Sequence, residues 1–288
     1  MVFQQLFATI IVVYTTFWLP RTLADSLDKA LHAYAKDDTE TAVKILKDLA
    51  SDDDKQALMH LAKIQMRGDS PKEALNTTER LIEKYPLDAD AHHAFGMANL
   101  TMMSEVGVFK LMTSARQARA GWEMAVELDA NHLDGLYALF SYYANAPKIG
   151  GGDIEKAQAL QVIMADLNEG YGRLALGVLN VKAEKFAEAE IAFIETSKIM
   201  DTAGAYFALA QFYLGQERYA KALEAISNFS IKPADFWDPH PSVQHLVVAR
   251  AQVGLGNIEA AKKAVEAGLA TKPGKRMRKF FDETLRDL

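Results

Sequence analysis

The sequence predicts an all-α solenoid, in which helical hairpins stack in line along most of the chain. Three observations predict this fold class. Alanine recurs at a nearly regular interval, the segments around each alanine have the apolar periodicity of helices, and turns with Gly, Asp or Glu separate them. The recurring alanines are Ala42, Ala74, Ala118, Ala157, Ala189, Ala222 and Ala261. The successive differences between these numbers are 32, 44, 39, 32, 33 and 39 residues, which indicates about seven units, some with insertions.

The units share one skeleton of large and small side chains. A first helix carries a large residue beside a small one, such as Leu209-Ala210, and a bulky residue such as Tyr213 follows three positions later. A second helix then opens around the recurring alanine, here Ala222. The small residues allow the helices to approach closely, and the large ones fill the space between adjacent hairpins.

Four units show this skeleton most clearly, at residues 55–88, 170–202, 203–235 and 242–274. Two of them close with Pro86 and Pro273, which end the second helix because proline clashes with the preceding turn and donates no backbone hydrogen bond. In these residues the chain resembles the tetratricopeptide repeat family, whose period is about 34 residues. The match covers nearly all of residues 25–274. The resemblance implies a right-handed superhelical solenoid of about seven hairpins.

The end of such an array needs a closing element, because each hairpin is stabilised by stacking on its neighbours. Residues 275–288 have the pattern of an amphipathic helix and are the predicted C-terminal capping helix. We expect its apolar residues to face inward and its charged residues to face water. The residues expected inside are Met277, Phe280, Phe281 and Leu285.

Composition limits the functions that the chain can have. Its formal net charge of −6 does not favour binding to nucleic acid. It has no cysteine, which excludes disulfides, thiolate metal sites and a cysteine nucleophile. No G-x-S-x-G, protein-kinase or dinucleotide-binding motif is present, and acidic runs such as Asp52-Asp53-Asp54 fall at expected helix starts. We therefore expect no enzymatic activity, no cofactor and no metal site.

The first residues differ from the repeats. Residues 6–19 are mostly apolar, and Pro20 and the segment Thr22-Leu23-Ala24 follow, which is typical of a secretory signal peptide covering residues 1–24. Residues 1–5 contain no Lys or Arg, so an uncleaved N-terminal anchor is the alternative. The run of 14 residues is, however, shorter than the roughly 20 that span a bilayer. We expect a periplasmic or secreted chain whose mature form does not enter the membrane, which would resemble the bacterial periplasmic members of the family.

Three segments depart from the repeat. Between Gly96 and Ala118 the third unit has about ten extra residues, for which we expect both helices of the hairpin to be extended. In the fourth unit, residues 145–153 contain three glycines and Lys148 before Asp153. A phosphate-binding loop is one interpretation, but no Ser or Thr follows the lysine as the Walker pattern requires, and Asp153 suits the N-cap of the next helix.

The third departure is the proline-rich loop at residues 231–245. It holds Phe236-Trp237 together with Asp235, Asp238, His240 and His245. Aromatic residues here can hold the loop on the solenoid or contact a partner. The acidic and histidine side chains make a metal- or ligand-dependent accessory protein an alternative function, although their spacing matches no known metal motif.

The family resemblance implies that the first helices of the hairpins line a concave groove for an extended peptide or a partner helix. The chain is then an adaptor or scaffold for another protein, and a membrane-anchored assembly factor is the alternative if the leader is retained. The side chains that the resemblance places in the groove are Met59, Lys63, Arg67, His93, Met97, Tyr137, Ser141, Asn145, Tyr171, Val178, Phe207, Gln211 and Arg250. The Lys/Asn/Arg set with which some family members hold a C-terminal carboxylate is not apparent.

Overall fold

The structure is a computed structural model that describes residues 24–36, 38–68, 70–103, 107–229 and 239–286. Most of the predicted leader and residues 231–238 of the proline-rich loop lie outside these ranges. The described residues contain helices and no β-strand. Among them, no helix combines the length and apolar character needed to cross a bilayer.

The helices follow one another as hairpins. Residues 24–35 are helical and are followed by α2, Thr39–Ser51. The other helices are α3 Lys55–Arg67, α4 Pro71–Lys84, α5 Ala89–Met102, α6 Val108–Leu128, α7 Leu133–Asn145, α8 Ile154–Leu167, α9 Glu169–Lys182, α10 Phe186–Met200, α11 Ala203–Gly215, α12 Tyr219–Ser227, α13 Ser242–Gly254, α14 Ile258–Ala270 and α15 Lys275–Arg286, with a 3₁₀ turn η1 at Lys148–Gly150. Over the described residues this makes seven hairpins and a closing helix, as the sequence predicts.

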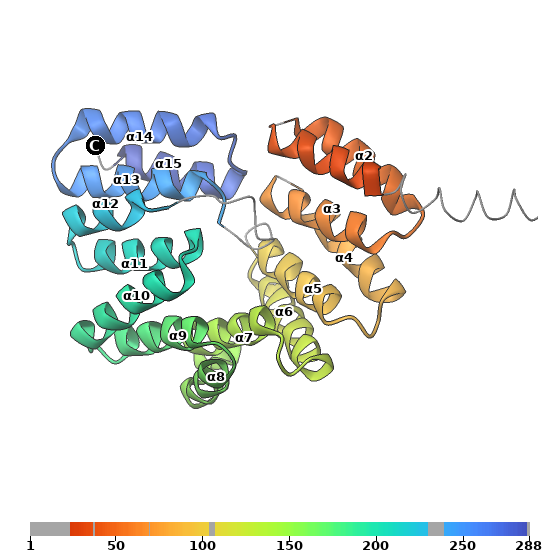
Figure 1. Ribbon diagram of the computed structural model, residues 1–288, viewed down its shortest axis with the longest axis horizontal. Helices are drawn as coiled ribbons and strands as arrows, with labels where there is room; N and C mark the ends of the chain where they lie inside the picture. Colours follow the sequence, from red (N-terminus) through yellow and green to blue (C-terminus); the bar gives the residue numbers. More distant parts are fainter. Residues whose placement is uncertain (1–23, 37, 69, 104–106, 230–238, 287–288) are drawn as a thin grey trace, which may run out of the picture.

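Each second helix packs on the first helix of its own hairpin and on the first helix of the next one. Helix α4 contacts α3 and α5, α8 contacts α7 and α9, and α12 contacts α11 and α13. This stacking curves the array, and both of its ends lie at the top of the view in Figure 1. The first helices α3, α5, α7, α9, α11 and α13 follow the inner side of the curve (Figure 1).

The recurring alanines lie where the helices of a hairpin meet. All seven, from Ala42 to Ala261, are 0% exposed and lie on second helices. Glycines serve the same purpose on first helices. A Cβ atom on Gly177 would lie 2.9 Å from the ring of Phe193, and one on Gly96 would lie 2.9 Å from the backbone oxygen of Ala118. Small residues at these positions therefore permit the close helix contacts that the repeat needs.

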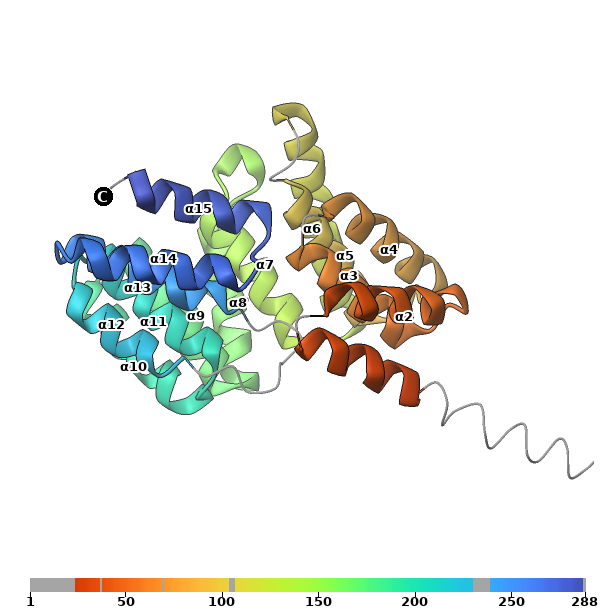
Figure 2. The same cartoon turned by 90° about the horizontal axis from the view of Figure 1, so that it is seen from above.

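The long third hairpin corrects one prediction. Only its second helix is extended, because α6 has 21 residues whereas α5 has 14, the same length as α4 and α9. Gly107, in an extended conformation, is the N-cap of α6. Figure 2 shows the first turns of α6 projecting beyond the neighbouring helices.

The closing helix α15 packs on both helices of the last hairpin, α13 and α14. Phe281 is fully buried there, and Met277 and Phe280 are partly buried against the same cluster. Leu285, which the sequence predicts inside, is 41% exposed, and Thr284 is buried in its place. The reason is helical spacing, since Met277, Phe281 and Thr284 follow one another at four and three residues and share a face.

Candidate functional site

The inner side of the array contains a cleft of about 720 Å³ between α7, α9 and α11, which we call the main cleft. Helices α7 and α9 pack directly on each other. The main cleft is largely apolar, since Leu174, Val181, Phe193, Ala208 and Phe212 belong to its lining. Six of the predicted groove residues line it, namely Tyr137, Asn145, Tyr171, Val178, Phe207 and Gln211.

A second hollow of about 490 Å³ lies between α11, α13 and α15. The predicted groove residue Arg250 lines it, together with Tyr219 and Glu283. The guanidinium carbon of Arg250 also lies 5.5 Å from the centre of the Phe280 ring, so the closing helix covers part of this side chain. Gln211 and Gly215 line both hollows, which therefore adjoin along α11.

The other predicted groove residues line neither hollow. Met59, Lys63 and His93 are only 8%, 7% and 3% exposed, so the expectation that they present their side chains to a partner is wrong for these three. The physical reason is that α3 and α5 pack directly on each other. Met59 thereby belongs to an apolar cluster with Leu46, Leu58 and Leu81, which we call the first apolar cluster. His93 packs edge-to-face on His132, with ring centres 5.3 Å apart. The half-buried residues in this set are Arg67, Met97 and Ser141.

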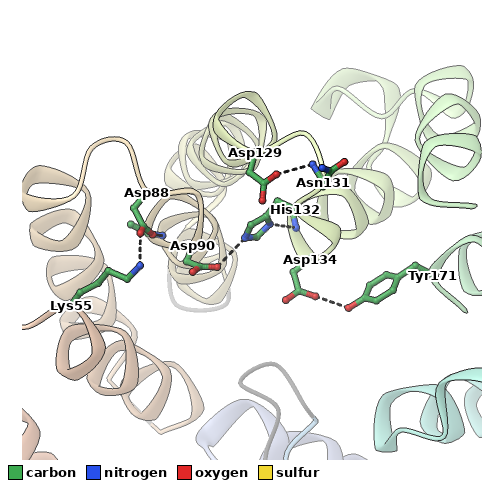
Figure 3. A network of polar contacts seen from close by, with 10 residues as sticks. Lys55, Asp88, Asp90, Asp129, Asn131, His132, Asp134 and Tyr171 are labelled. Carbon is green, nitrogen blue, oxygen red and sulfur yellow. Dashed lines mark hydrogen bonds and ion pairs between the residues drawn. The ribbon is translucent and has the colours of Figure 1, made fainter. Parts of the chain in front are cut away.

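A ladder of polar contacts joins the N-terminal ends of four successive first helices (Figure 3). Lys55 on α3 forms an ion pair with Asp88, the N-cap of α5. The next contact joins Asp90 on α5 to His132, the N-cap of α7, at 3.1 Å between Oδ1 and Nε2. The sequence shows these acidic residues only as helix-start signals, and it does not reveal that they also connect one hairpin to the next.

The last contact of this ladder lies at the main cleft. The Tyr171 hydroxyl on α9 donates to Asp134 Oδ1 on α7 at 2.7 Å, and both residues line the cleft. The ring of Tyr171 also lies edge-on to that of Tyr137, with centres 6.0 Å apart. The ladder therefore fixes the aromatic wall of the main cleft.

The two stacked histidines have opposite electrostatic environments. Burial lowers the pKa of His93 to about 3, so this ring is neutral at physiological pH. The hydrogen bond to Asp90 raises the pKa of His132, and the same contact lowers the pKa of Asp90. In the neutral form of His132, Nδ1 accepts a hydrogen bond from Gly135 N–H at 2.9 Å and Nε2 faces Asp90. Both ring nitrogens are thus engaged in holding the structure, which does not favour a role as a catalytic base.

The pKa of Glu190 is also shifted, and contacts between helices explain this shift. The Arg218 guanidinium lowers the pKa of Glu190 to about 2, and Lys221 and Tyr213 also donate to this carboxylate. These residues connect α10 to the turn before α12 and to α11 and α12. Structural ion-pair networks of this kind also shift pKa values.

The glycine-containing loop of the fourth unit is a structural turn. The backbone amides of Gly150, Gly151 and Gly152 all donate to carbonyl oxygens inside the loop, and the amide of Asp153 donates to Tyr143 O. No amide of these four is left to hold a phosphate group. The Asp153 side chain accepts from Glu155 N and Lys156 N at 3.1 Å each, which confirms it as the N-cap of α8.

The proline-rich loop is described only in part. Asp235 and Asp238 lie outside the described residues, so the alternative metal site there stays a prediction. His240 Nδ1 lies 2.8 Å from the Ser242 hydroxyl at the start of α13. In the part of the chain that the structure describes, no group of three His, Asp or Glu side chains is arranged to hold a metal ion.

No protein-family model and no curated protein sequence matches this chain. Solved structures do match its fold. A tetratricopeptide repeat protein from Parabacteroides merdae superposes with a TM-score of 0.58 at 14% identity, over 93% of this chain and 98% of that one. The human IFIT1 dimer with PPP-AAAA gives 0.52 at 19% identity, over 85% of this chain and 54% of that one.

The APC/C hetero-tetramer Cut9–Hcn1 gives a TM-score of 0.50 at 14% identity, and the match covers 80% of this chain and 42% of that one. At such identities the likeness concerns the fold. Together with the register of the seven buried alanines, it shows that the chain has the tetratricopeptide repeat fold.

Proposed function

We propose that the chain is a non-enzymatic scaffold or adaptor that holds a segment of another protein in its concave groove, at the main cleft. The observation that carries this proposal is the cleft itself, which is about 720 Å³ in volume and lies on the inner side of the curved array. Three consecutive first helices supply most of its lining, so its shape depends on the stacking of the repeats and not on one loop.

The lining suits a peptide. Tyr137, Tyr171 and Phe207 supply rigid aromatic area, and Asn145 and Gln211 supply amide groups that can meet the main chain of an extended segment. Such a combination lets the aromatic side chains contribute affinity while the polar groups set the register of the peptide. The formal charge of −6 supports a protein or peptide as the partner in preference to nucleic acid.

A variant that fills the cleft without disturbing the core tests the proposal. Gly204, in the first turn of α11, lines the cleft, and a Cβ atom there would meet nothing closer than Pro239 Cδ at 4.0 Å. Gly204→Leu should therefore fold normally and occupy the cleft. Ala159→Leu, at an exposed position of α8, is the matched control for an added apolar side chain.

The measurement is cross-linking in the native cell followed by identification of the captured proteins, together with circular dichroism of each purified variant. We expect Gly204→Leu to lose the partners that the wild type and Ala159→Leu capture, at equal helical content. Replacing Tyr137, Tyr171 and Phe207 together with Ala should have the same effect on capture. Unchanged partner recovery by a folded Gly204→Leu variant rejects the main cleft as the binding site.

We further propose that the protein works outside the cytoplasm, in the periplasm or cell envelope, and that residues 1–24 direct its export. The apolar run at residues 6–19 and the small residues before Asp25 support this proposal. Cell fractionation and mass spectrometry of the mature N-terminus test it. A chain that begins at Asp25 fits a cleaved leader, whereas an intact N-terminus in the membrane fraction supports an anchored assembly factor.

A further inference from the structure

The end of the main cleft beside the polar ladder differs in chemistry from the rest of its lining. Asp134, Tyr137 and Tyr171 come together there, from the first two turns of α7 and the first turn of α9. Figure 3 shows the Tyr171 ring directed toward the Asp134 carboxylate. Phe207, in the second turn of α11, also belongs to the lining. A carboxylate therefore lies among aromatic rings at one end of an apolar cleft.

The geometry of this group is fixed before any ligand arrives. The Tyr171 hydroxyl holds Asp134 Oδ1 at 2.7 Å, and Tyr137 is held both by its edge contact with Tyr171 and by stacking on Phe140 at 5.9 Å between ring centres. A carboxylate has lone pairs on both oxygens, so it accepts further hydrogen bonds beside the one from Tyr171. The faces of aromatic rings attract cations, and preorganised rings lose little entropy when they bind one.

Charge around the cleft favours the same ligand chemistry. Asp201 precedes α11, and the chain as a whole carries −6. Arg173, the basic residue closest in sequence to Tyr171, is occupied by Glu169 and Glu195. Lys182 lines the cleft at the opposite end of α9, on the order of 16 Å from Tyr171 along the helix axis. The two ends of the cleft therefore carry charges of opposite sign, Asp134 at one end and Lys182 at the other.

We propose that the Asp134 end of the main cleft receives a lysine or arginine side chain of the bound peptide, with the cation beside the Tyr171 ring and directed to Asp134. A neighbouring apolar side chain of the same peptide fills the middle of the cleft. Lys182 disfavours a cation at the far end, so the peptide binds in one direction. This inference rests on the proposed function, because it names the chemistry of the segment that the groove holds.

The test uses random 12-residue peptides displayed on phage and selected on the full chain. Synthetic copies of the selected peptides are then measured by fluorescence anisotropy. Asp134→Asn removes the charge but keeps an oxygen that accepts from Tyr171, so the cleft retains its shape. We expect the selected peptides to share a Lys or Arg beside an aromatic or aliphatic residue, and Asp134→Asn to weaken them about tenfold.

Two comparisons make the result specific. Asp166→Asn removes the same charge at an exposed position of α8 outside the cleft and should not weaken these peptides. Replacing the basic residue of a peptide with norleucine should cost about tenfold on the wild type and little on Asp134→Asn, because the two changes remove the same interaction.

The outcomes separate this inference from the proposed function. Peptides that bind the wild type but not Gly204→Leu support the groove as the binding site. If such peptides share no basic residue, or bind Asp134→Asn as tightly as the wild type, the cation site is overturned. A selection that recovers no peptide dependent on Gly204 overturns both.

Discussion

The two halves of the inner surface differ although they are built from the same repeat. On α3 and α5 side chains at groove positions, such as Met59 and His93, are buried. On α7, α9 and α11 the corresponding side chains, such as Tyr137 and Phe207, line an open cleft. The repeat register therefore predicts which way a side chain faces, and the packing between hairpins decides whether anything is left open in front of it.

Local packing explains the difference. In the N-terminal half, α3 and α5 pack on each other, and the His132 side chain at the start of α7 packs against His93. In the C-terminal half α7 and α9 also pack on each other, but aromatic side chains such as Phe207 and Phe212 line a space between α9 and α11, and the main cleft opens there. Whether a cleft opens in this array thus depends on how much space the packing leaves between successive first helices.

The largest expected effect is a loss of stability in the N-terminal half, where side chains at groove positions on α3 and α5 are buried and which we call the closed half. Met59→Ala removes a side chain that is 8% exposed inside the first apolar cluster, and should lower the free energy of unfolding by about 2–4 kcal/mol. Met66→Ala, at a half-buried position on the same helix, is the matched control and should cost less. Urea unfolding followed by circular dichroism measures both. Equal effects at the two positions would show that α3 is not packed as closely as the structure indicates.

The buried His93 should make the closed half sensitive to acid. Its pKa is about 3 in the folded chain and ordinary when unfolded, so the unfolded state binds the extra proton below about pH 6.5. Stability is therefore lost as pH falls from about 6.5 toward 3, by about 1.5 kcal/mol between pH 6.5 and 5. The raised pKa of His132 acts in a different window, since its stabilisation is complete below about pH 6.5 and is lost as pH rises.

His93→Gln keeps a polar side chain without an ionisable ring. It therefore tests whether the loss of stability in acid comes from His93. Urea midpoints at pH 6.5 and pH 5 should differ less for His93→Gln than for the wild type. If both proteins lose the same stability on acidification, the sensitivity comes from other groups.

Most of the fold can be predicted from the sequence, because its determinants are local and periodic. The seven alanines from Ala42 to Ala261 recur with the hairpins, and every one is fully buried. The Asp153 N-cap is equally predictable, since a capping residue acts within one turn of its own helix. Leu285 is not, because the choice between Thr284 and Leu285 for the buried face depends on how α15 lies on α13 and α14.

The candidate site is predictable in part. Periodicity identifies the face of each first helix, and this is enough to find Tyr137, Tyr171 and Phe207. It does not show how closely two helices approach, which is why Lys63 is buried although it occupies a groove position. Sequence reasoning misses Asp134 because an acidic residue in the first turn of a helix has an ordinary explanation in the helix dipole. Its contact with Tyr171 joins residues 37 positions apart, which the repeat pattern does not specify.

A smaller effect on stability is expected from the hydrogen bond between α9 and α7 at the main cleft. Tyr171→Phe removes the hydroxyl that donates to Asp134 across two hairpins, and should cost about 1 kcal/mol because the carboxylate is still partly solvated. Tyr206→Phe is the matched control, since its hydroxyl donates to Asp201 only five residues away on an exposed edge. Hydrogen exchange should increase at the start of α9 in Tyr171→Phe alone. Equal changes in both variants would mean that the ladder does not hold the hairpins together.

The smallest expected effect on stability comes from Gln211, and it separates binding from folding most sharply. Gln211 is half-buried on α11 and lies at the point where the main cleft and the second hollow adjoin. Gln211→Ala should change the free energy of unfolding by less than about 0.5 kcal/mol, because the side chain contributes little to the core. It should weaken the peptides selected on the wild type by about two- to tenfold, the value of one lost hydrogen bond. A variant that unfolds more easily but binds the peptides equally well would place Gln211 with Met59, as a packing residue, and would confine the open surface to the aromatic wall of the cleft.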